Sequence, residues 1–99
     1  MFSMLDNMIL MMLAKKEMYG YELMKSLKEF TLGFYEPKSG TLYPSLKRLE
    51  EKELIQSEIR QVDENHYKYY RITEKGKARL ERMWTFITKI QNFRAKVGV

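Results

Sequence analysis

The sequence contains no cysteine and only one histidine among its 99 residues. The absence of cysteine excludes disulfides, zinc fingers and thiol catalysis. His66 stands alone in a polar stretch, where a surface residue is far more common than a metal ligand or a catalytic base. The sequence also has no nucleophile elbow, no phosphate-binding loop and no carboxylate pair at a motif spacing. We therefore predict that the protein is not an enzyme and needs no metal and no cofactor.

Long apolar runs are missing as well. The apolar stretch at residues 8–14 is far shorter than the ~20 residues that a membrane helix needs. Residues 1–6 include no basic residue of the kind that opens a secretory signal. We therefore expect a cytoplasmic protein without a membrane partner. No linker, low-complexity tract or repeat divides the chain, and 99 residues suffice for one domain with a modest core.

Basic residues outnumber acidic ones, with 18 Lys and Arg against 13 Asp and Glu and a net charge of +5. This excess favours a polyanionic partner. Charge alone is weak support, because many small soluble proteins are mildly basic. The partner has to be inferred from the order of the elements along the chain.

The first predicted helix spans residues 4–15. Ser3 is a good N-cap, and Asp6 brings a carboxylate close to the free N–H groups of the first turn. The helix is apolar nearly all round, which predicts burial on two sides. One side can face its own core, and the other needs a second partner such as another subunit.

Two further helices follow. The second runs from residue 19 or 20 to residue 31 and stops at Gly33. The third runs from residue 39 or 41 to residue 52, with Ser39 or Thr41 as its N-cap. The apolar back of this third helix consists of Leu42, Ser45, Leu46 and Leu49. Its basic and partly aromatic front consists of Gly40, Tyr43, Pro44, Lys47, Arg48 and Glu51.

A hairpin is predicted next. Residues 54–60 alternate between apolar and polar, residues 66–72 are rich in tyrosine, and the polar residues 61–65 join the two strands. Tyr70 and Ile72 are expected to face the core.

The final helix is predicted over residues 74–96, with Thr73 as its cap. It would be ~35 Å long, and the preceding unit is too small to cover its apolar stripe. A second copy of this helix, or the first helix of a second subunit, would cover it. The predicted dimer interface consists of Leu5, Met8, Met12, Leu80, Met83, Trp84, Ile87, Ile90 and Phe93.

Three helices, a two-stranded wing and a long helix form the order of a winged helix-turn-helix protein. The predicted fold class is mainly α with a small β-hairpin (α+β). Residues 1–73 form the winged helix-turn-helix DNA-binding domain, and residues 74–99 form a C-terminal dimerisation helix.

Four blocks of the sequence resemble the PadR family of bacterial transcriptional regulators. They are Tyr19-Gly20-Tyr21-Glu22-Leu23, Tyr35-Glu36-Pro37, the block from Gly40-Thr41-Leu42-Tyr43-Pro44 to Glu50, and the block from Lys68-Tyr69-Tyr70-Arg71 to Gly76. The resemblance implies a DNA-binding repressor that dimerises through its first and last helices. The single C-terminal helix is similar to the small subgroup, which includes sensors of planar aromatic or drug-like molecules. A ligand of this kind would lie near Trp84, Met8 and Met12.

The expected DNA contacts lie on the front of the third helix and at the start of the second. Lysine and arginine can bond guanine edges or phosphates, while a tyrosine hydroxyl and free N–H groups at a helix start suit a phosphate oxygen. The set is Tyr19, Gly20, Tyr21, Ser39, Thr41, Tyr43, Pro44, Lys47, Arg48, Lys68 and Arg71. The wing tip at residues 62–66 departs from the family, because it is acidic where a basic, glycine-rich tip is common.

Two functions remain open at this point. The first is a dimeric, sequence-specific repressor of a palindromic operator, released by a small effector. The second is a winged-helix protein-interaction module without specific DNA binding, supported by the acidic pair Asp63-Glu64. Individual residues also have simpler interpretations. Lys47 and Arg48 can belong to a solvated helix face, and Trp84 can contribute ordinary packing to a dimer interface.

Overall fold

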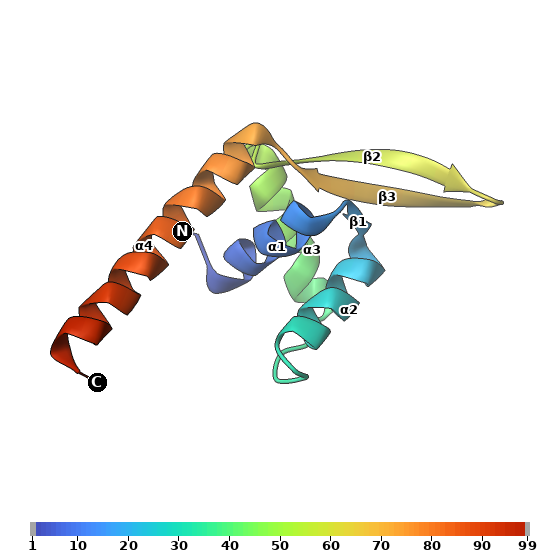
Figure 1. Cartoon of the computed structure of the whole chain (residues 1–99). Helices are drawn as coiled ribbons and strands as arrows, with labels where there is room; N and C mark the ends of the chain where they lie inside the picture. Colours follow the sequence, from blue (N-terminus) through green and yellow to red (C-terminus); the bar gives the residue numbers. More distant parts are fainter. Residues whose placement is uncertain (1, 99) are drawn as a thin grey trace.

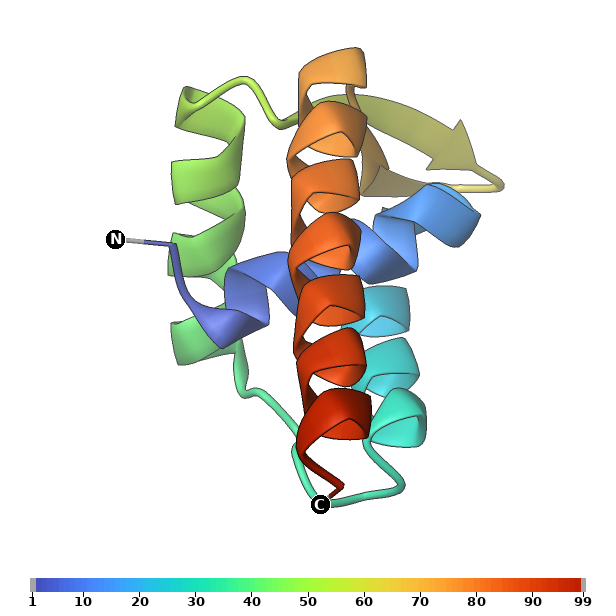
Figure 2. The same cartoon turned by 60° about the vertical axis from the view of Figure 1, so that its left-hand side comes forward.

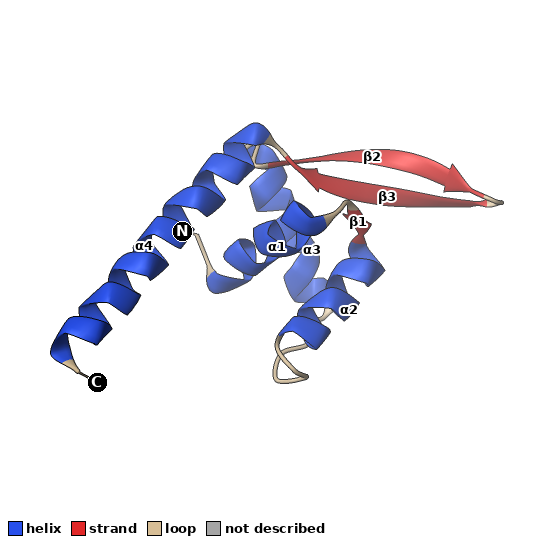
Figure 3. Cartoon of the chain, viewed as in Figure 1, coloured by secondary structure: helices blue, strands red, loops and turns tan. Residues whose placement is uncertain are grey.

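The computed structural model describes residues 2–98. Residue 1 of the predicted DNA-binding domain and residue 99 of the predicted dimerisation helix lie outside it. Four helices and a three-stranded antiparallel sheet follow one another along the chain (Figures 1 and 3). They are α1 (Met4–Lys15), β1 (Met18–Tyr19), α2 (Gly20–Phe30), α3 (Ser39–Glu51), β2 (Ile55–Val62), β3 (Asn65–Ile72) and α4 (Glu74–Val97). The predicted α+β class, with a wing between α3 and a long last helix, is confirmed.

Helix α1 has the predicted bounds and lies at the centre of the fold, in contact with α2, α3, α4 and β3. Its start is fixed by a reciprocal cap. The Asp6 N–H donates to Ser3 Oγ, and the Ser3 N–H donates to Asp6 Oδ2, both at 3.1 Å. This arrangement satisfies two of the N–H groups that a helix start leaves without partners. Figure 2 shows α1 crossing behind α4.

The start of α3 differs from the prediction. Neither Ser39 nor Thr41 is the N-cap, because Lys38 occupies that position in an extended conformation and no side chain caps the helix. Pro37, two residues before Ser39, is buried, whereas Lys38 and Ser39 are exposed. At the end of α2, Gly33 has the left-handed φ of +83° expected of a helix stop, but Leu32 also has a positive φ, +55°.

The sheet contains one more strand than predicted. β1 has only two residues, too few to show an alternating pattern, and it pairs Met18 with Tyr70 and Tyr19 with Tyr69. The strand order is therefore β1-β3-β2. The wing strands are also longer than predicted, since their pairing continues to Val62 opposite Asn65.

The predicted loop at residues 61–65 shrinks to a two-residue turn. Asp63 adopts a φ of +58°, the left-handed conformation that a tight hairpin turn requires. Asp63 and Glu64 therefore lie at the very tip of a long hairpin (Figure 1).

Helix α4 begins at the predicted cap. The Thr73 hydroxyl oxygen accepts from the Gly76 N–H at 3.0 Å, and the hydroxyl donates to the Glu53 carbonyl at 2.7 Å. Gly76 packs so tightly that a Cβ there would lie 2.2 Å from the carbonyl oxygen of Leu54. The first half of α4 lies on α1 and β3, while its second half projects away from the body (Figure 1).

A single apolar core is enclosed by α1, α2, α3, the sheet and the first half of α4. Tyr70 belongs to this core as predicted, and so does the apolar back of α3. The buried apolar residues are Leu5, Ile9, Leu10, Met12, Leu13, Met18, Leu23, Leu27, Leu42, Leu46, Leu49, Leu54, Ile55, Tyr70 and Leu80. Within residues 2–98, no helix is both long enough and apolar enough to cross a membrane.

Candidate nucleic-acid interface

The outer face of α3 is the most open basic surface next to the wing. Gly40, Tyr43, Pro44 and Lys47 are exposed, while the opposite side of the helix is buried. Lys47 has no ion-pair partner in the part of the chain that the structure describes. Its ammonium group is therefore available to an anion or to a base edge.

Arg48, which was predicted to join Lys47 on this face, is exposed and is also tied to α1. Its Nη2 lies 3.3 Å from Asp6 Oδ1 and 3.1 Å from Ser45 Oγ. The Ser45 hydroxyl also donates to the same Asp6 carboxylate. Asp6 is 1 % exposed at its side chain, whereas Arg48 remains half-exposed. The pair joins the first turn of α1 to the middle of α3.

The ionised form of Asp6 is favoured by these partners. Burial by itself would raise the pKa of this carboxyl group, but hydrogen bonds from Ser45 and Ser3 and the positive charge of Arg48 lower it below the ordinary value. Asp6 is therefore a carboxylate at neutral pH, and its charge holds the guanidinium group of Arg48 in place.

The N-terminus of α3 is free of side-chain caps. Lys38, Ser39, Gly40 and Thr41 are all exposed, and an added Cβ at Gly40 would meet no atom within 4 Å. The first N–H groups of a helix have no partners inside the helix, and the helix dipole makes this end positive. A phosphate group can approach this end closely. Lys38 was missing from the predicted contacts, because only the observed start of the helix makes it the capping residue.

The start of α2 packs directly against the front of α3. Gly20 is buried there, and a Cβ at this position would lie 2.1 Å from the Tyr43 hydroxyl oxygen. Glycine at residue 20 therefore allows the Tyr43 ring to cross the first turn of α2. This contact brings two of the predicted DNA-binding segments together.

The two tyrosines that flank Gly20 have different environments. Tyr19 packs on the rings of Tyr67 and Tyr69, with centroid distances of 4.8 and 5.4 Å, so it helps to anchor β1 on β3. Tyr21 is exposed at the helix start. Of the two, Tyr21 is the more exposed.

Most cations of the wing are engaged by other side chains. Lys68 Nζ lies 3.9 Å from a Glu50 carboxylate oxygen, and Arg71 donates to Gln56 Oε1 at 3.0 Å. Arg60 is held by two carboxylates, those of Glu17 and Glu58, and its guanidinium lies 4.6 Å from the Tyr69 ring centroid. The exposed tip carries only the acidic side chains of Asp63 and Glu64 as charges between Val62 and Asn65.

The predicted dimer residues fall into three groups. Leu5, Met12 and Leu80 are buried in the core of one chain, so they are already covered without a partner. Met8, Met83 and Ile87 are half-buried at the edge of the core. Trp84, Ile90 and Phe93 are exposed on α4. The sequence pattern identified an apolar helix but did not separate its inner face from its outer face.

The sequence is similar to known proteins of one family. The profile of the "Transcriptional regulator PadR-like family" matches residues 9–82. An uncharacterized protein, protein X, of Lysinibacillus sphaericus is 38% identical over 90 residues, 87% of this chain and 83% of its own. The "Transcriptional regulator YqjI" of Escherichia coli is 40% identical over 73 residues, which are 74% of this chain but only 34% of the relative.

Solved structures agree with this relationship. A PadR family transcription regulator from Clostridium difficile has a TM-score of 0.76 and 39% identity, covering 91% of this chain and 96% of its own. Bacillus subtilis PadR in complex with operator DNA has a TM-score of 0.72 and 31% identity, covering 81% of this chain and 45% of its own. Family and neighbours are transcriptional regulators and not enzymes. The chain thus belongs to the PadR-like family of transcriptional regulators.

Proposed function

We propose that this protein is a sequence-specific DNA-binding repressor that acts as a homodimer on a roughly palindromic operator. The observation that carries the proposal is the open front of α3, where Lys47 lies without an ion-pair partner among residues 2–98, on the same helix as the uncapped N-terminus. Both features suit phosphates and base acceptors. The similar Bacillus subtilis PadR was solved in complex with operator DNA, which supports DNA as the partner.

We assign different tasks to the contacts. Lys47, Tyr43 and Pro44 face the bases from the exposed side of α3, while Ser39 and Thr41 at its start face phosphates. Tyr21 binds a phosphate from the start of α2, where the Tyr43 ring over Gly20 fixes the spacing of the two helices. Lys68 and Arg71 on the wing add weaker phosphate contacts, because each already has a partner. Arg48 holds α3 against α1.

A selection from random-sequence DNA tests the central claim. The expected product is a palindrome with half-sites about one helical turn, ~34–36 Å, apart. With that DNA, Lys47→Glu should lower affinity more than about tenfold, because it replaces the partner-free cation with a repelled anion. Lys15→Glu changes the net charge equally but lies at the exposed end of α1, outside the proposed contacts, so it should change affinity less than about threefold. A selection that yields no preferred sequence would refute the proposed sequence-specific DNA binding.

The outer face of α4 is the proposed contact surface of the homodimer. Residues 1–73 bind DNA and residues 74–99 dimerise in this scheme, with residues 1 and 99 outside the described structure. Trp84, Ile90 and Phe93 expose apolar surface on a helix whose second half leaves the body of the chain. Burying such surface on a second copy is favourable, and a two-fold arrangement uses the same face twice. Sedimentation of the protein, with Phe93→Asp as the disrupting variant, tests this.

A planar aromatic effector bound beside Trp84 completes the proposal. Trp84 is half-exposed and Met8 is half-buried, so both can contact a ligand between subunits. Met12 lies in the core and is removed from this site. Trp84 is the only tryptophan, so its fluorescence reports on this position alone. Titration with a panel of planar aromatics should quench the signal and release the operator. Quenching without operator release would refute the regulatory role.

The acidic wing tip favours one alternative, a protein-interaction module of the cytoplasm. Asp63 and Glu64 are exposed at the end of the hairpin, far from the front of α3 (Figure 1). Asp63→Lys combined with Glu64→Lys should leave operator affinity unchanged or slightly higher if DNA is the partner. Loss of a protein partner with these changes, together with full tolerance of Lys47→Glu, would favour the alternative.

A further inference from the structure

We propose that the turn between α2 and α3 is a docking surface for the second half of α4 from another copy of this chain. The surface is the turn patch, defined as Phe30, Leu32 and Phe34. The inference rests on the proposed homodimer and extends it to a segment for which the sequence predicted only a helix stop and a loop.

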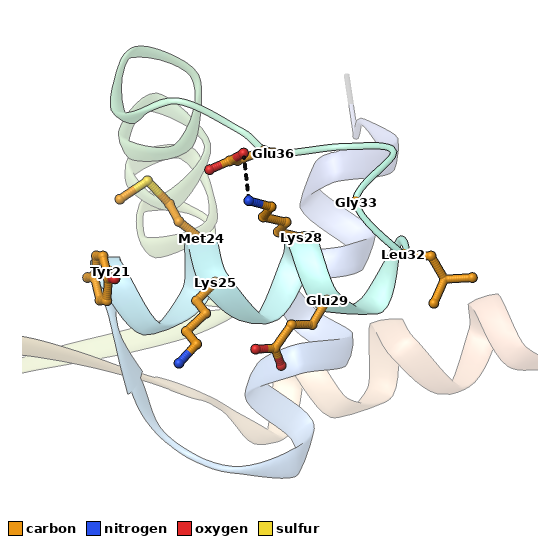
Figure 4. Close-up of a pocket in the computed structure, with 8 residues that line it drawn as sticks. All are labelled: Tyr21, Met24, Lys25, Lys28, Glu29, Leu32, Gly33 and Glu36. Carbon is orange, nitrogen blue, oxygen red and sulfur yellow. Dashed lines mark ion pairs between the residues drawn. The ribbon is translucent and has the colours of Figure 1, made fainter.

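The turn patch gathers three large exposed apolar side chains within a short stretch of the chain. Leu32 is 86 % exposed and Phe34 is 93 % exposed, and half of Phe30 is accessible as well. Single exposed apolar residues are ordinary, but three large ones within five positions are a local concentration of the kind that marks interaction sites. A groove of about 610 Å³ runs beside the patch along α2 (Figure 4). It is lined by Tyr21, Met24, Lys25, Lys28, Glu29, Leu32, Gly33 and Glu36.

The turn holds this patch in one conformation. The Thr31 hydroxyl oxygen accepts from the Tyr35 N–H at 3.0 Å, and the Gly33 N–H donates to the Lys28 carbonyl at 2.8 Å. Lys28 pairs with Glu36 at 3.4 Å across the turn (Figure 4). Leu32 has a left-handed φ of +55°, which is unfavourable for a residue with a Cβ. The bonds of the turn keep Leu32 in that conformation and direct its side chain outward (Figure 4).

The second half of α4 has the matching surface. Phe86, Ile90, Phe93 and Val97 are all exposed, and their spacing of four, three and four residues places them along one side of the helix. The turn patch and the end of α4 lie on opposite sides of α1 in the same chain (Figure 1), so neither can cover the other. In a two-fold dimer each α4 can reach the partner's turn patch, and the contact forms twice.

Area and charge both favour this pairing. The two surfaces together expose roughly 800 Å² of apolar side chain per chain, taking about 200 Å² for a whole aromatic residue. Two chains would bury about twice that, which is the size of a standard stable interface. From residue 82 onward the described part of α4 carries basic but no acidic side chains. Glu29 and Lys25 both line the groove without an ion-pair partner within residues 2–98, and Glu29 lies one helical turn closer to the turn patch.

Cysteine cross-linking tests the contact directly, since the chain has no cysteine of its own. Chains with Leu32→Cys and chains with Phe93→Cys are co-expressed and treated with a short bismaleimide. The expected result is a linked pair that contains one chain of each kind. Ile59→Cys lies at an exposed apolar position on the wing and serves as the matched control. Equal yields for Leu32→Cys and Ile59→Cys with the Phe93→Cys partner would overturn the docking surface.

Dissociation of the dimer separates this inference from the proposed homodimer. Phe34→Asp and Phe93→Asp should each raise the dimer dissociation constant at least ~30-fold, because each change affects two symmetric contacts. Ile59→Asp should leave it unchanged. If Phe93→Asp dissociates the dimer and Phe34→Asp does not, the turn patch is not part of the interface while the homodimer stands. If the unchanged protein is monomeric at all concentrations, the homodimer itself fails. Circular dichroism confirms that each variant is folded.

Discussion

The contact between Asp6 and Arg48 gives a quantitative prediction about what holds α3 in place. Asp6→Asn keeps the size of the side chain but removes the negative charge that Arg48, Ser45 and the Ser3 N–H share. Each hydrogen bond to a charged group contributes about 1.5–3 kcal/mol. The asparagine oxygen can still accept one of them, and the half-exposed Arg48 is partly screened by water. We therefore expect a loss of about 2–3 kcal/mol in the free energy of unfolding.

Such a loss is easily measured in a domain of this size. For 60–100 residues, 1 kcal/mol shifts Tm by about 4–8 °C, so Asp6→Asn should lower Tm by roughly 8–24 °C at neutral pH. Thermal and urea unfolding followed by circular dichroism give the value, at one fixed protein concentration because the proposed dimerisation would add to stability. Asp63→Asn removes an exposed carboxylate at the wing tip and is the matched control, with an expected change below about 0.5 kcal/mol.

The dependence on pH supplies a second check. The pKa of Asp6 is lowered in the folded chain, so its contribution is fully present above the ordinary aspartate pKa of about 3.9. The contribution is lost as the pH falls through the lower pKa of the folded state. The difference between the unchanged protein and Asp6→Asn should therefore be constant above about pH 5 and shrink below about pH 4. A variant as stable as the Asp63→Asn control, or a difference that does not change in acid, would refute the role given to Asp6.

Three further variants test the packing and the proposed interface. Gly76→Ala should destabilise the fold by more than about 2 kcal/mol in urea unfolding. The alanine Cβ would lie 2.2 Å from the Leu54 carbonyl oxygen, and backbone cannot easily move aside. Normal stability would contradict the packing of α4. The methyl group of Gly40→Ala would meet no atom within 4 Å, so this variant should be more stable by up to about 1 kcal/mol. It should nevertheless weaken operator binding in a gel shift, because the bound DNA would face that methyl group. Unchanged binding would place the start of α3 away from DNA. Arg60→Ala should change stability by less than about 1 kcal/mol and operator affinity by less than about threefold, since Glu17 and Glu58 already neutralise this arginine. A large loss of affinity would show that Arg60 binds phosphate in spite of these two carboxylates.

Local interactions made much of the fold predictable. The bounds of α1, the buried back of α3, the Thr73 cap and the inward side of Tyr70 all depend on residues within a few positions of one another. Helical and strand periods and hydroxyl caps act over that range, so the sequence alone determined the succession of elements and hence the winged-helix class. It also determined which side of α3 faces outward.

Tertiary structure decided how these elements use their remaining side chains. The partner of Arg48 is 42 residues away, and the Glu17 that holds Arg60 is 43 residues away, so no local pattern separates these cations from the free Lys47. β1 forms only because Met18 and Tyr19 meet β3. Leu80 and Phe93 look equivalent along α4, yet the core covers one and leaves the other exposed. Folding covers one face of each element. The charged and apolar groups on the other faces stay accessible, and these are the groups available for the proposed contacts with DNA and with a second copy.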